Sequence, residues 1–266
     1  MSEIGVAAAQ FGPVADEAVN LERIRELATQ AAGRGARVVV LPEYSSYFVD
    51  PFDDTLAAHA QSVDGPFVEG LRDLAARLEQ VVVAGLLEQG SGGRVRNTVV
   101  AVGADGPLAT YRKAHLYDAF GQRESDRVEP GDLTAPETFD LDGLRFGLVT
   151  CYDLRFPEST RVLADAGVTA VLVPAQWVRG PLKEDHWATL IAARAIENTC
   201  YVAAADHPPK YGIGLSRVVD PQGVTLAGVG AGDGLAVGFL AADEVRRVRE
   251  RNPALKLRRY RVVPRG

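Results

Sequence analysis

The stretch LRFGLVTCYDLRFPE, residues 144–158, contains the clearest local structural signal in the chain. Its first seven residues are mostly apolar, which predicts a short buried strand. Pro157 follows at a position typical of the first turn of a helix. We therefore expect a strand, a tight turn beginning at Cys151, and a helix. Such a turn presents a nucleophile and lets backbone N–H groups face a developing oxyanion.

Apolar runs and amphipathic helices alternate on both sides of this stretch, which predicts an α/β fold of mixed sheets covered by helices. Besides residues 144–150, we expect strands at 4–9, 37–41, 81–87, 96–102, 108–112, 139–140, 168–173, 199–205, 215–219, 224–228 and 235–240. We expect helices at 17–32, 67–78, 157–166 and 182–197, and a last helix from about residue 242. No linker, low-complexity segment or repeat interrupts the pattern. We therefore expect one domain over residues 1–266, whose C-terminal helix and tail (about 242–266) pack on it or on a partner subunit.

The composition is that of an ordinary globular protein, with 47% hydrophobic and 24% charged residues. The net charge of −6 argues against nucleic acid as the main partner. Basic residues gather between Arg246 and Arg265; they form either a binding patch or, as the acidic remainder of the chain favours, a solvated helix and an arm that pairs with acidic neighbours.

The expected location is the cytoplasm. The first residues carry an acid at Glu3 and lack the basic region of a signal peptide. No apolar run approaches the roughly 18 residues that span a membrane, so no membrane association is expected. Cys151 and Cys200 are the two cysteines of the sequence, and both are expected as free thiols.

Three polar residues follow predicted strands directly. They are Glu43, Lys113 and Cys151. Groups beyond strand ends converge on the ligand crevice of α/β proteins. Each residue alone is weak evidence, because charged residues often begin solvated loops and a free cysteine is usually a buried apolar side chain. Cys200 lies within an apolar strand and is interpreted as structural.

A histidine-based mechanism or a metal site would need other combinations of residues. A Cys–His pair would need one of four histidines beside Cys151, namely His59, His115, His186 or His207. His115 lies two residues after Lys113 and is interpreted as a structural or supporting residue. No histidine or cysteine pair has metal-ligand spacing, so we predict neither a metal nor a cofactor.

The ordered motifs VLPE (40–43), YRKAHL (111–116) and CYDLRFPE (151–158) closely resemble those of the nitrilase, or carbon–nitrogen hydrolase, superfamily and its Glu–Lys–Cys triad. Segments 174–177, 194–198 and 214–216 match it as well. The resemblance extends from about Ile4 to the last helix. It implies an α-β-β-α sandwich that pairs into a homodimer or larger homo-oligomer.

The resemblance also implies the roles of individual residues. Cys151 would attack an amide carbon and form a thioester, with Glu43 as general base. Lys113 and the backbone N–H of Tyr152 would stabilise the oxyanion, and Lys113 would lower the thiol pKa. A second glutamate would orient Lys113: Glu124 is the better match, and Glu129 is its rival.

The residues after the nucleophile resemble the amidase branch that includes ω-amidases and deaminated-glutathione amidases. This implies a small aliphatic ω-amide that carries a carboxylate and releases ammonia. An N-carbamoyl compound, a nitrile, or a non-catalytic binding protein are the alternatives. Arg155 either clamps a substrate carboxylate or, as we favour, braces acidic neighbours. Aromatic residues near the motifs are the other pocket candidates: Tyr47, Phe48, Tyr117, Phe120 and Trp177.

Overall fold

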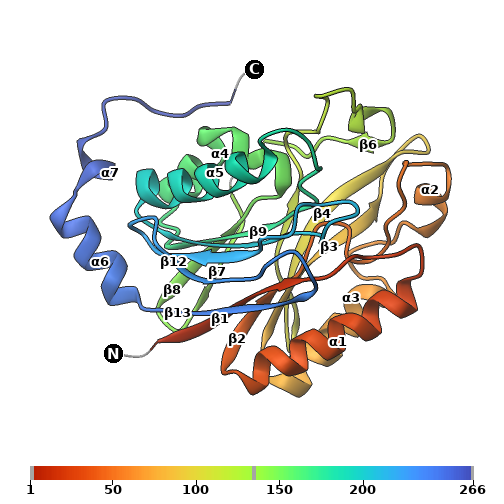
Figure 1. The fold of residues 1–266 in the computed structure, drawn as a ribbon, viewed down its shortest axis with the longest axis horizontal. Coiled ribbons are helices and arrows are strands. Elements are labelled where there is room, and N and C mark those ends of the chain that lie inside the picture. Colours follow the sequence, from red (N-terminus) through yellow and green to blue (C-terminus); the bar gives the residue numbers. More distant parts are fainter. Residues whose placement is uncertain (1–2, 134–135, 265–266) are drawn as a thin grey trace.

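The computed structural model describes residues 3–133 and 136–264, and within these ranges the strands form two mixed β-sheets. The sheets pack face to face between two layers of helices (Figure 1). The expected strands and helices form, most of them with bounds shifted by one or two residues. The predicted α-β-β-α sandwich is therefore confirmed. The predicted range 1–266 includes terminal residues that lie outside the described ones.

The first sheet has the strand order β13-β1-β2-β3-β4-β5, with β6 beside β4. Its strands are β1 (Ile4–Gln10), β2 (Ala36–Val40), β3 (Val81–Gln89), β4 (Val95–Gly103), β5 (Gly106–Arg112), β6 (Val128–Glu129) and β13 (Gly234–Leu240). Helices α1 (Glu17–Gly33) and α3 (Pro66–Leu78) connect the parallel strands β1, β2 and β3. The short helix α2 (Thr55–His59) was not expected from the sequence.

The second sheet has the order β12-β11-β10-β9-β8-β7. Its strands are β7 (Thr138–Leu141), β8 (Leu144–Leu148), β9 (Ala170–Pro174), β10 (Tyr201–Ala205), β11 (Arg217–Val219) and β12 (Thr225–Gly228). Helices α4 (Pro157–Asp165) and α5 (Lys183–Asn198) connect the parallel strands β8, β9 and β10. Two short 3-10 helices, η1 (Glu124–Asp126) and η2 (Cys151–Arg155), carry residues from the sequence motifs.

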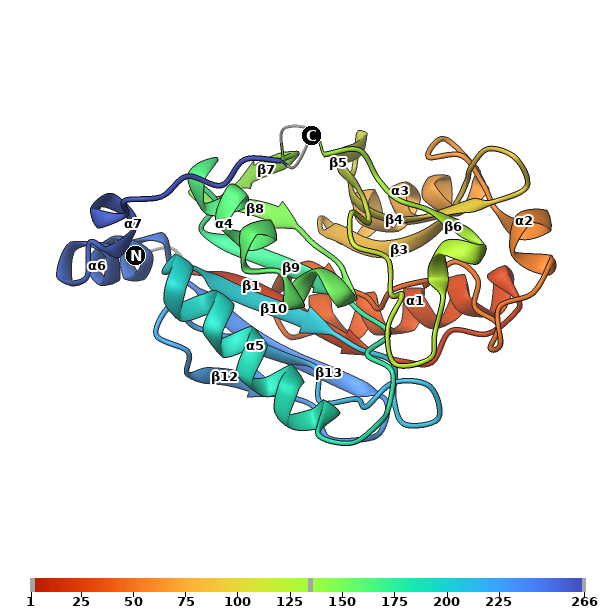
Figure 2. The ribbon, with the colours of Figure 1, turned by 90° about the horizontal axis from the view of Figure 1, so that it is seen from above.

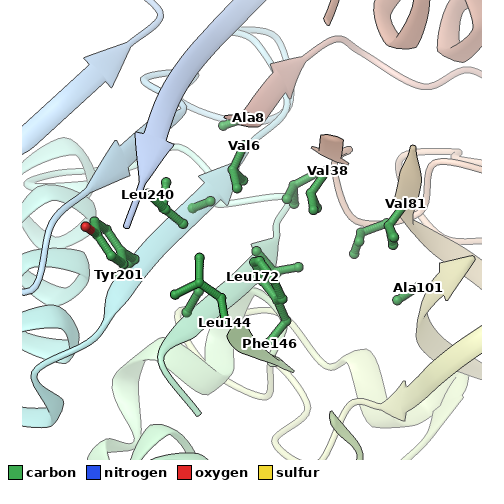
Figure 3. Packing of buried hydrophobic residues seen from close by; sticks show 14 of the residues in the cluster. Val6, Ala8, Val38, Val81, Ala101, Leu144, Phe146, Leu172, Tyr201 and Leu240 are labelled. Carbon is green, nitrogen blue, oxygen red and sulfur yellow. The ribbon is translucent and has the colours of Figure 1, made fainter. Parts of the chain in front are cut away.

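The alternation of side chains along each strand explains the continuous apolar runs. In β1, Val6 and Ala8 face the other sheet, whereas Ala7 and Ala9 face α1 and α3. Both faces of the strand are therefore buried. Figure 3 shows the cluster between the sheets, where side chains such as Val6 and Leu172 from opposite sheets point toward each other.

The C-terminal segment packs on its own chain, at least in part. It contains α6 (Ala242–Arg251) and α7 (Ala254–Leu257), after which the chain runs back past α4 (Figures 1 and 2). Arg249 Nη2 donates a hydrogen bond to the carbonyl of Val168 at 2.9 Å, and Arg258 pairs with Asp165. Part of the basic tail thus binds the chain itself, whereas Arg265 lies outside the described residues. In the ranges that the structure describes, no helix combines the length and apolar character needed to cross a membrane.

We expect Gly85→Ala to destabilise the fold, because β3 closely approaches the turn after β2. A Cβ at Gly85 would lie 2.3 Å from the backbone nitrogen of Tyr44 and 2.8 Å from the Cα of Glu43. Overpacking of this kind costs roughly 1–3 kcal/mol, which should lower the urea midpoint of unfolding. Gly33→Ala is the matched control, since its Cβ would meet nothing within 4 Å. Equal midpoints for the two variants would contradict the prediction.

Candidate active site

The three predicted residues at strand ends lie in one buried region. Glu43 follows β2, Lys113 follows β5, and Cys151 begins η2 just after β8. Their exposed fractions are 1%, 2% and 5%. Glu43 and Lys113 come from the first sheet and Cys151 from the second. The site therefore exists only where the two sheets meet.

Glu43 is fixed by three donors. Its Oε1 accepts hydrogen bonds from Lys113 Nζ at 2.8 Å and from Asn97 Nδ2 at 2.6 Å. Its Oε2 accepts one from the backbone N–H of Gln176 at 2.7 Å. Gln176 follows β9, so the second sheet helps to hold a carboxylate that the first sheet supplies.

The same Gln176 residue connects Glu43 to the thiol. Its carbonyl accepts a hydrogen bond from Cys151 Sγ at 3.4 Å, while its N–H binds Glu43. Cys151 has φ +46°, a conformation that costs free energy in a non-glycine residue and persists where surrounding contacts enforce it. The tight turn expected after β8 is thus present, and the nucleophile lies at its strained position.

Glu124 is the second glutamate beside Lys113. Its Oε2 lies 2.9 Å from Lys113 Nζ and also accepts from the backbone N–H of Tyr117 at 2.6 Å. Tyr44 Oη donates to its Oε1 at 2.6 Å. The rival Glu129 instead pairs with Arg96 and Arg94 and accepts from Ser91.

The two glutamates differ in their tendency to bind a proton. Burial raises the pKa of Glu43, and the charge of Lys113 only partly opposes this. Burial acts on Glu124 as well, but there the charge of Lys113 and hydrogen bonds from Tyr44 and Asn97 prevail and lower the pKa. Carboxyl groups whose pKa values are pushed apart in one site are suited to different roles. Glu43 is therefore the better proton acceptor, and Glu124 the better permanent anion.

The charge state of Lys113 follows from these neighbours. Burial by itself would lower its pKa, but the negative charges of Glu124 and Glu43 raise the pKa well above its ordinary value. The ammonium group therefore remains protonated and can stabilise a nearby oxyanion.

The pKa of Cys151 departs from the expectation. We predicted that Lys113 would lower it, but burial of the thiol and the negative charge of Glu43 raise the pKa well above the usual value, and Lys113 only partly opposes them. The pKa is raised chiefly because the thiol is buried, and further because the site holds two carboxylates for one ammonium group. The resting nucleophile is a thiol, which needs a base at the moment of attack.

A small cavity opens beside the thiol. It is lined by Tyr117, Cys151, Tyr152, Arg155, Gln176, Trp177, Val178 and Lys183. Three of the predicted pocket residues, Tyr117, Arg155 and Trp177, are thus at the cavity. Tyr152, whose N–H is the expected oxyanion donor, lines it as well.

The other aromatic candidates, Tyr47, Phe48 and Phe120, are not among the residues that line the cavity. Phe120 is 67% exposed and lies near the cavity, with Lys183 Nζ 4.5 Å from the centre of its ring. Tyr47 is not among the lining residues: its ring stacks on His59, and its hydroxyl donates to Thr55. Tyr47 therefore packs against α2 and has a structural role there.

Arg155 and Lys183 bring two positive charges to the cavity. Neither has a carboxylate within 4 Å among the residues that the structure describes, so the acidic bracing that we favoured for Arg155 is wrong. Arg155 Nη2 instead donates to His186 Nδ1 at 3.3 Å, and Lys183 Nζ donates to Tyr117 Oη at 2.9 Å. Burial and the charge of Arg155 lower the pKa of Lys183. An anion in the cavity would therefore lie close to two cations that have no carboxylate partner among the described residues.

Three residues of the site were not predicted from the sequence: Asn97, Gln176 and Lys183. Asn97 lies inside the buried strand β4, and a polar side chain in such a run needs partners. The polar residue in an apolar run could be seen in the sequence, but the sequence does not tell which residues are its hydrogen-bond partners. Gln176 acts mainly through its backbone, which no side-chain pattern reveals. Lys183 resembles any lysine at the start of a helix.

The histidines do not form a Cys–His pair with Cys151 among the described contacts. His115 Nδ1 lies 2.7 Å from Asp153 Oδ1. His207 is buried, which lowers its pKa to about 4, and its Nε2–H donates to the carbonyl of Glu43 at 2.7 Å. His207 thus supports Glu43 as a neutral residue. Within residues 3–133 and 136–264, no group of three or more potential metal-binding side chains is found.

Comparison with known proteins gives concordant matches. A family model described as carbon-nitrogen hydrolase matches residues 5–250. The deaminated glutathione amidase of Escherichia coli O157:H7 is 40% identical over 255 residues, 96% of this chain and 97% of that protein. The omega-amidase NIT2 of Mus musculus is 30% identical and covers 97% and 96% of the two chains. The crystal structure of Saccharomyces cerevisiae Nit3, a member of branch 10 of the nitrilase superfamily, has a TM-score of 0.83 at 27% identity and covers 97% of each chain.

The raised pKa of Cys151 predicts a specific alkylation profile. In a Cys200→Ala background, iodoacetamide should alkylate Cys151 at a rate that still increases above about pH 8.5, the ordinary pKa of a free cysteine. The reason is that the thiolate fraction keeps growing with pH until it levels off above the raised pKa. Mass spectrometry of quenched samples measures the rate. A profile that reaches its plateau well below that pH would show that the thiol is already ionised at rest.

Proposed function

The chain belongs to the carbon-nitrogen hydrolase family, and we propose that it hydrolyses a small primary amide bearing a carboxylate, with release of ammonia. The observation that carries this proposal is the position of Cys151 in one cavity with two unpaired cations, beside Glu43 and Lys113. The similarity to proteins named deaminated glutathione amidase and omega-amidase supports the choice of an amide.

In the first half of the reaction, Cys151 Sγ attacks the amide carbon while Glu43 takes the thiol proton. The carbonyl oxygen becomes an oxyanion, stabilised by Lys113 Nζ and the backbone N–H of Tyr152. As the oxyanion collapses, the C–N bond breaks and Glu43 donates its proton to the departing nitrogen. Ammonia leaves, and the acyl group remains on Cys151 as a thioester. The raised pKa of Glu43 suits a group that must both accept and return a proton.

In the second half, water attacks the thioester carbon and Glu43 takes one of its protons. The same two donors hold the second oxyanion. The C–S bond then breaks, and Glu43 returns the proton to the sulfur. The products are a carboxylic acid and the regenerated thiol, so one amide and one water give one acid and one ammonia.

Glu124 and Asn97 maintain the charge pattern during this cycle. Asn97 Nδ2 donates to Glu43 Oε1 and, at 3.0 Å, to Glu124 Oε1, so that it bridges the two carboxylates. Glu124 remains paired with Lys113 when Glu43 becomes protonated. The ammonium group therefore keeps a counter-ion at every step, which favours its charged form.

Arg155 and Lys183 supply the preference for an anionic substrate. Lys183 is buried and Arg155 is half-buried, and neither has a carboxylate partner among the described residues. A substrate carboxylate would offset the cost of desolvating both charges. Arg155 offers a planar fork that matches a carboxylate, whereas Lys183 offers a point charge. We infer that the amide end of the substrate faces Cys151 and the carboxylate end faces these cations. The homodimer and the cytoplasmic location expected from the sequence remain predictions.

The reaction is tested by measuring ammonia release from small ω-amides such as succinamic acid, from N-carbamoyl compounds and from nitriles. We expect release from the ω-amides, and Cys151→Ala should abolish it because no other group can form the acyl-enzyme. Cys200→Ala is the matched control and should retain activity, since Cys200 is buried away from the cavity. Carbon dioxide together with ammonia, or turnover of nitriles alone, would assign a different reaction of the family.

The role of Lys183 is tested by Lys183→Met. Loss of a hydrogen bond to a charged group costs about 1.5–3 kcal/mol, so KM for succinamic acid should rise roughly ten- to a hundredfold. Butyramide has a methyl group in place of the carboxylate, so its KM should be the same for the wild-type protein and for Lys183→Met. Lys210→Met is the matched control, because Lys210 also lies over an aromatic ring (Tyr211, 4.7 Å) but does not line the cavity. Equal KM increases for both amides would refute the carboxylate contact.

A further inference from the structure

Asp153 has a fully buried carboxylate that contacts two separate segments of the chain. The first segment is the turn that carries the nucleophile. Asp153 Oδ2 accepts a hydrogen bond from the backbone N–H of Thr150 at 3.0 Å, and the N–H of Asp153 donates to the Thr150 carbonyl at 3.0 Å. Cys151 and Tyr152 lie between these two residues. Asp153 therefore closes the turn around the thiol and around the Tyr152 N–H.

The second segment is the one that carries Lys113. Tyr111 Oη donates to Asp153 Oδ2 at 2.8 Å. The backbone N–H of His115 donates to Oδ1 at 3.2 Å, and His115 Nδ1 lies 2.7 Å from the same oxygen. Tyr111 and His115 each lie two residues from Lys113, one on either side. The Asp153 carboxylate is thus hydrogen-bonded to the chain before and after the lysine.

Contacts around His115 extend this connection. Its ring stacks on Phe156, with the ring centres 3.8 Å apart. Phe156 directly follows η2, the 3-10 helix that begins at Cys151. The Lys113 segment is therefore attached to the start of η2 through Asp153 and to its end through Phe156.

Resting on the proposed function, we propose that Asp153 is a positioning residue that sets the separation between the two oxyanion donors. One donor, Lys113 Nζ, belongs to the second segment, and the other, the Tyr152 N–H, belongs to the turn. An oxyanion must lie about 2.7–3.1 Å from each donor, and a displacement of about 1 Å can reduce the rate roughly a hundredfold. Asp153 touches neither the substrate nor the reacting atoms. It acts through the two segments that it joins.

The test compares a reaction that needs both donors with one that needs neither. Succinic semialdehyde is the aldehyde counterpart of succinamic acid: the Cys151 thiol adds to its carbonyl, the proton passes to Glu43, and the carbonyl oxygen becomes an oxyanion. Iodoacetamide alkylation forms a C–S bond and expels iodide without producing an oxyanion. A change in the separation of the donors should weaken the first reaction and leave the second unchanged.

The variants are Asp153→Asn and the milder Tyr111→Phe, with Tyr201→Phe as the matched control. Tyr201 is a buried tyrosine whose hydroxyl bonds to the backbone at Ala241, and it does not line the cavity. For both test variants we expect kcat for succinamic acid to fall roughly ten- to a hundredfold with KM nearly unchanged. The inhibition constant of the semialdehyde should rise by a similar factor, while alkylation of Cys151 keeps its rate.

Two outcomes would overturn the proposal. One is unchanged kcat and unchanged semialdehyde affinity in Tyr111→Phe. The other is a parallel loss of alkylation and of semialdehyde binding, which would mean that Asp153 merely maintains the shape of the thiol turn. Because aldehyde binding and alkylation require no turnover, both can be measured even if no amide is hydrolysed. Failure of the proposed function and failure of this proposal therefore remain distinguishable.

Discussion

The ammonium group of Lys113, buried between two carboxylates, is the interaction on which the rest of the site depends. It lies 2.8 Å from Glu43 and 2.9 Å from Glu124. Desolvation of three charges is costly, and such a group is tolerated only when additional hydrogen bonds complete it. Asn97, Tyr44, and the backbone N–H groups of Gln176 and Tyr117 provide these bonds. The strands of both sheets are needed to bring these donors together.

The charge distribution of the cavity follows from this arrangement. The buried group has two carboxylates for one ammonium, and this excess adds to burial of the Cys151 thiol in raising its pKa. On the other side, Arg155 and Lys183 lack carboxylate partners among the described residues. A substrate with an amide at one end and a carboxylate at the other matches this polarity. The same polarity would disfavour an amide that carries a positive charge.

The sandwich provides the rigidity that these distances require. The first sheet positions Glu43 and Lys113, and the second positions Cys151 and the Gln176 backbone. Interdigitated side chains between the sheets, seen in Figure 3, oppose any shift of one sheet against the other. The hydrogen bonds of Asp153 add a polar connection at the edge of this core, close to the reacting groups.

The sequence alone determined part of the fold and part of the site. Apolar runs and helical periodicity predicted the layered fold, because burial on both faces of a strand leaves a local pattern. The ordered motifs around Glu43, Lys113 and Cys151 predicted that these residues belong to one site, because they resemble those of a known family; the strand-end positions alone were weak evidence. These signals are local, so they can be read without knowing which segments touch.

The tertiary structure alone decided the rest. The sequence favoured Glu124 over Glu129 but left both open, and the path of the loop places Glu124 beside Lys113. The partners of Asn97, the backbone role of Gln176, and the arrival of Lys183 at the cavity depend on segments distant in the chain. The pKa of Cys151 was mispredicted because it reflects burial and the sum of several charges rather than the nearest one. Such properties come from long-range packing, which no local stretch of sequence encodes.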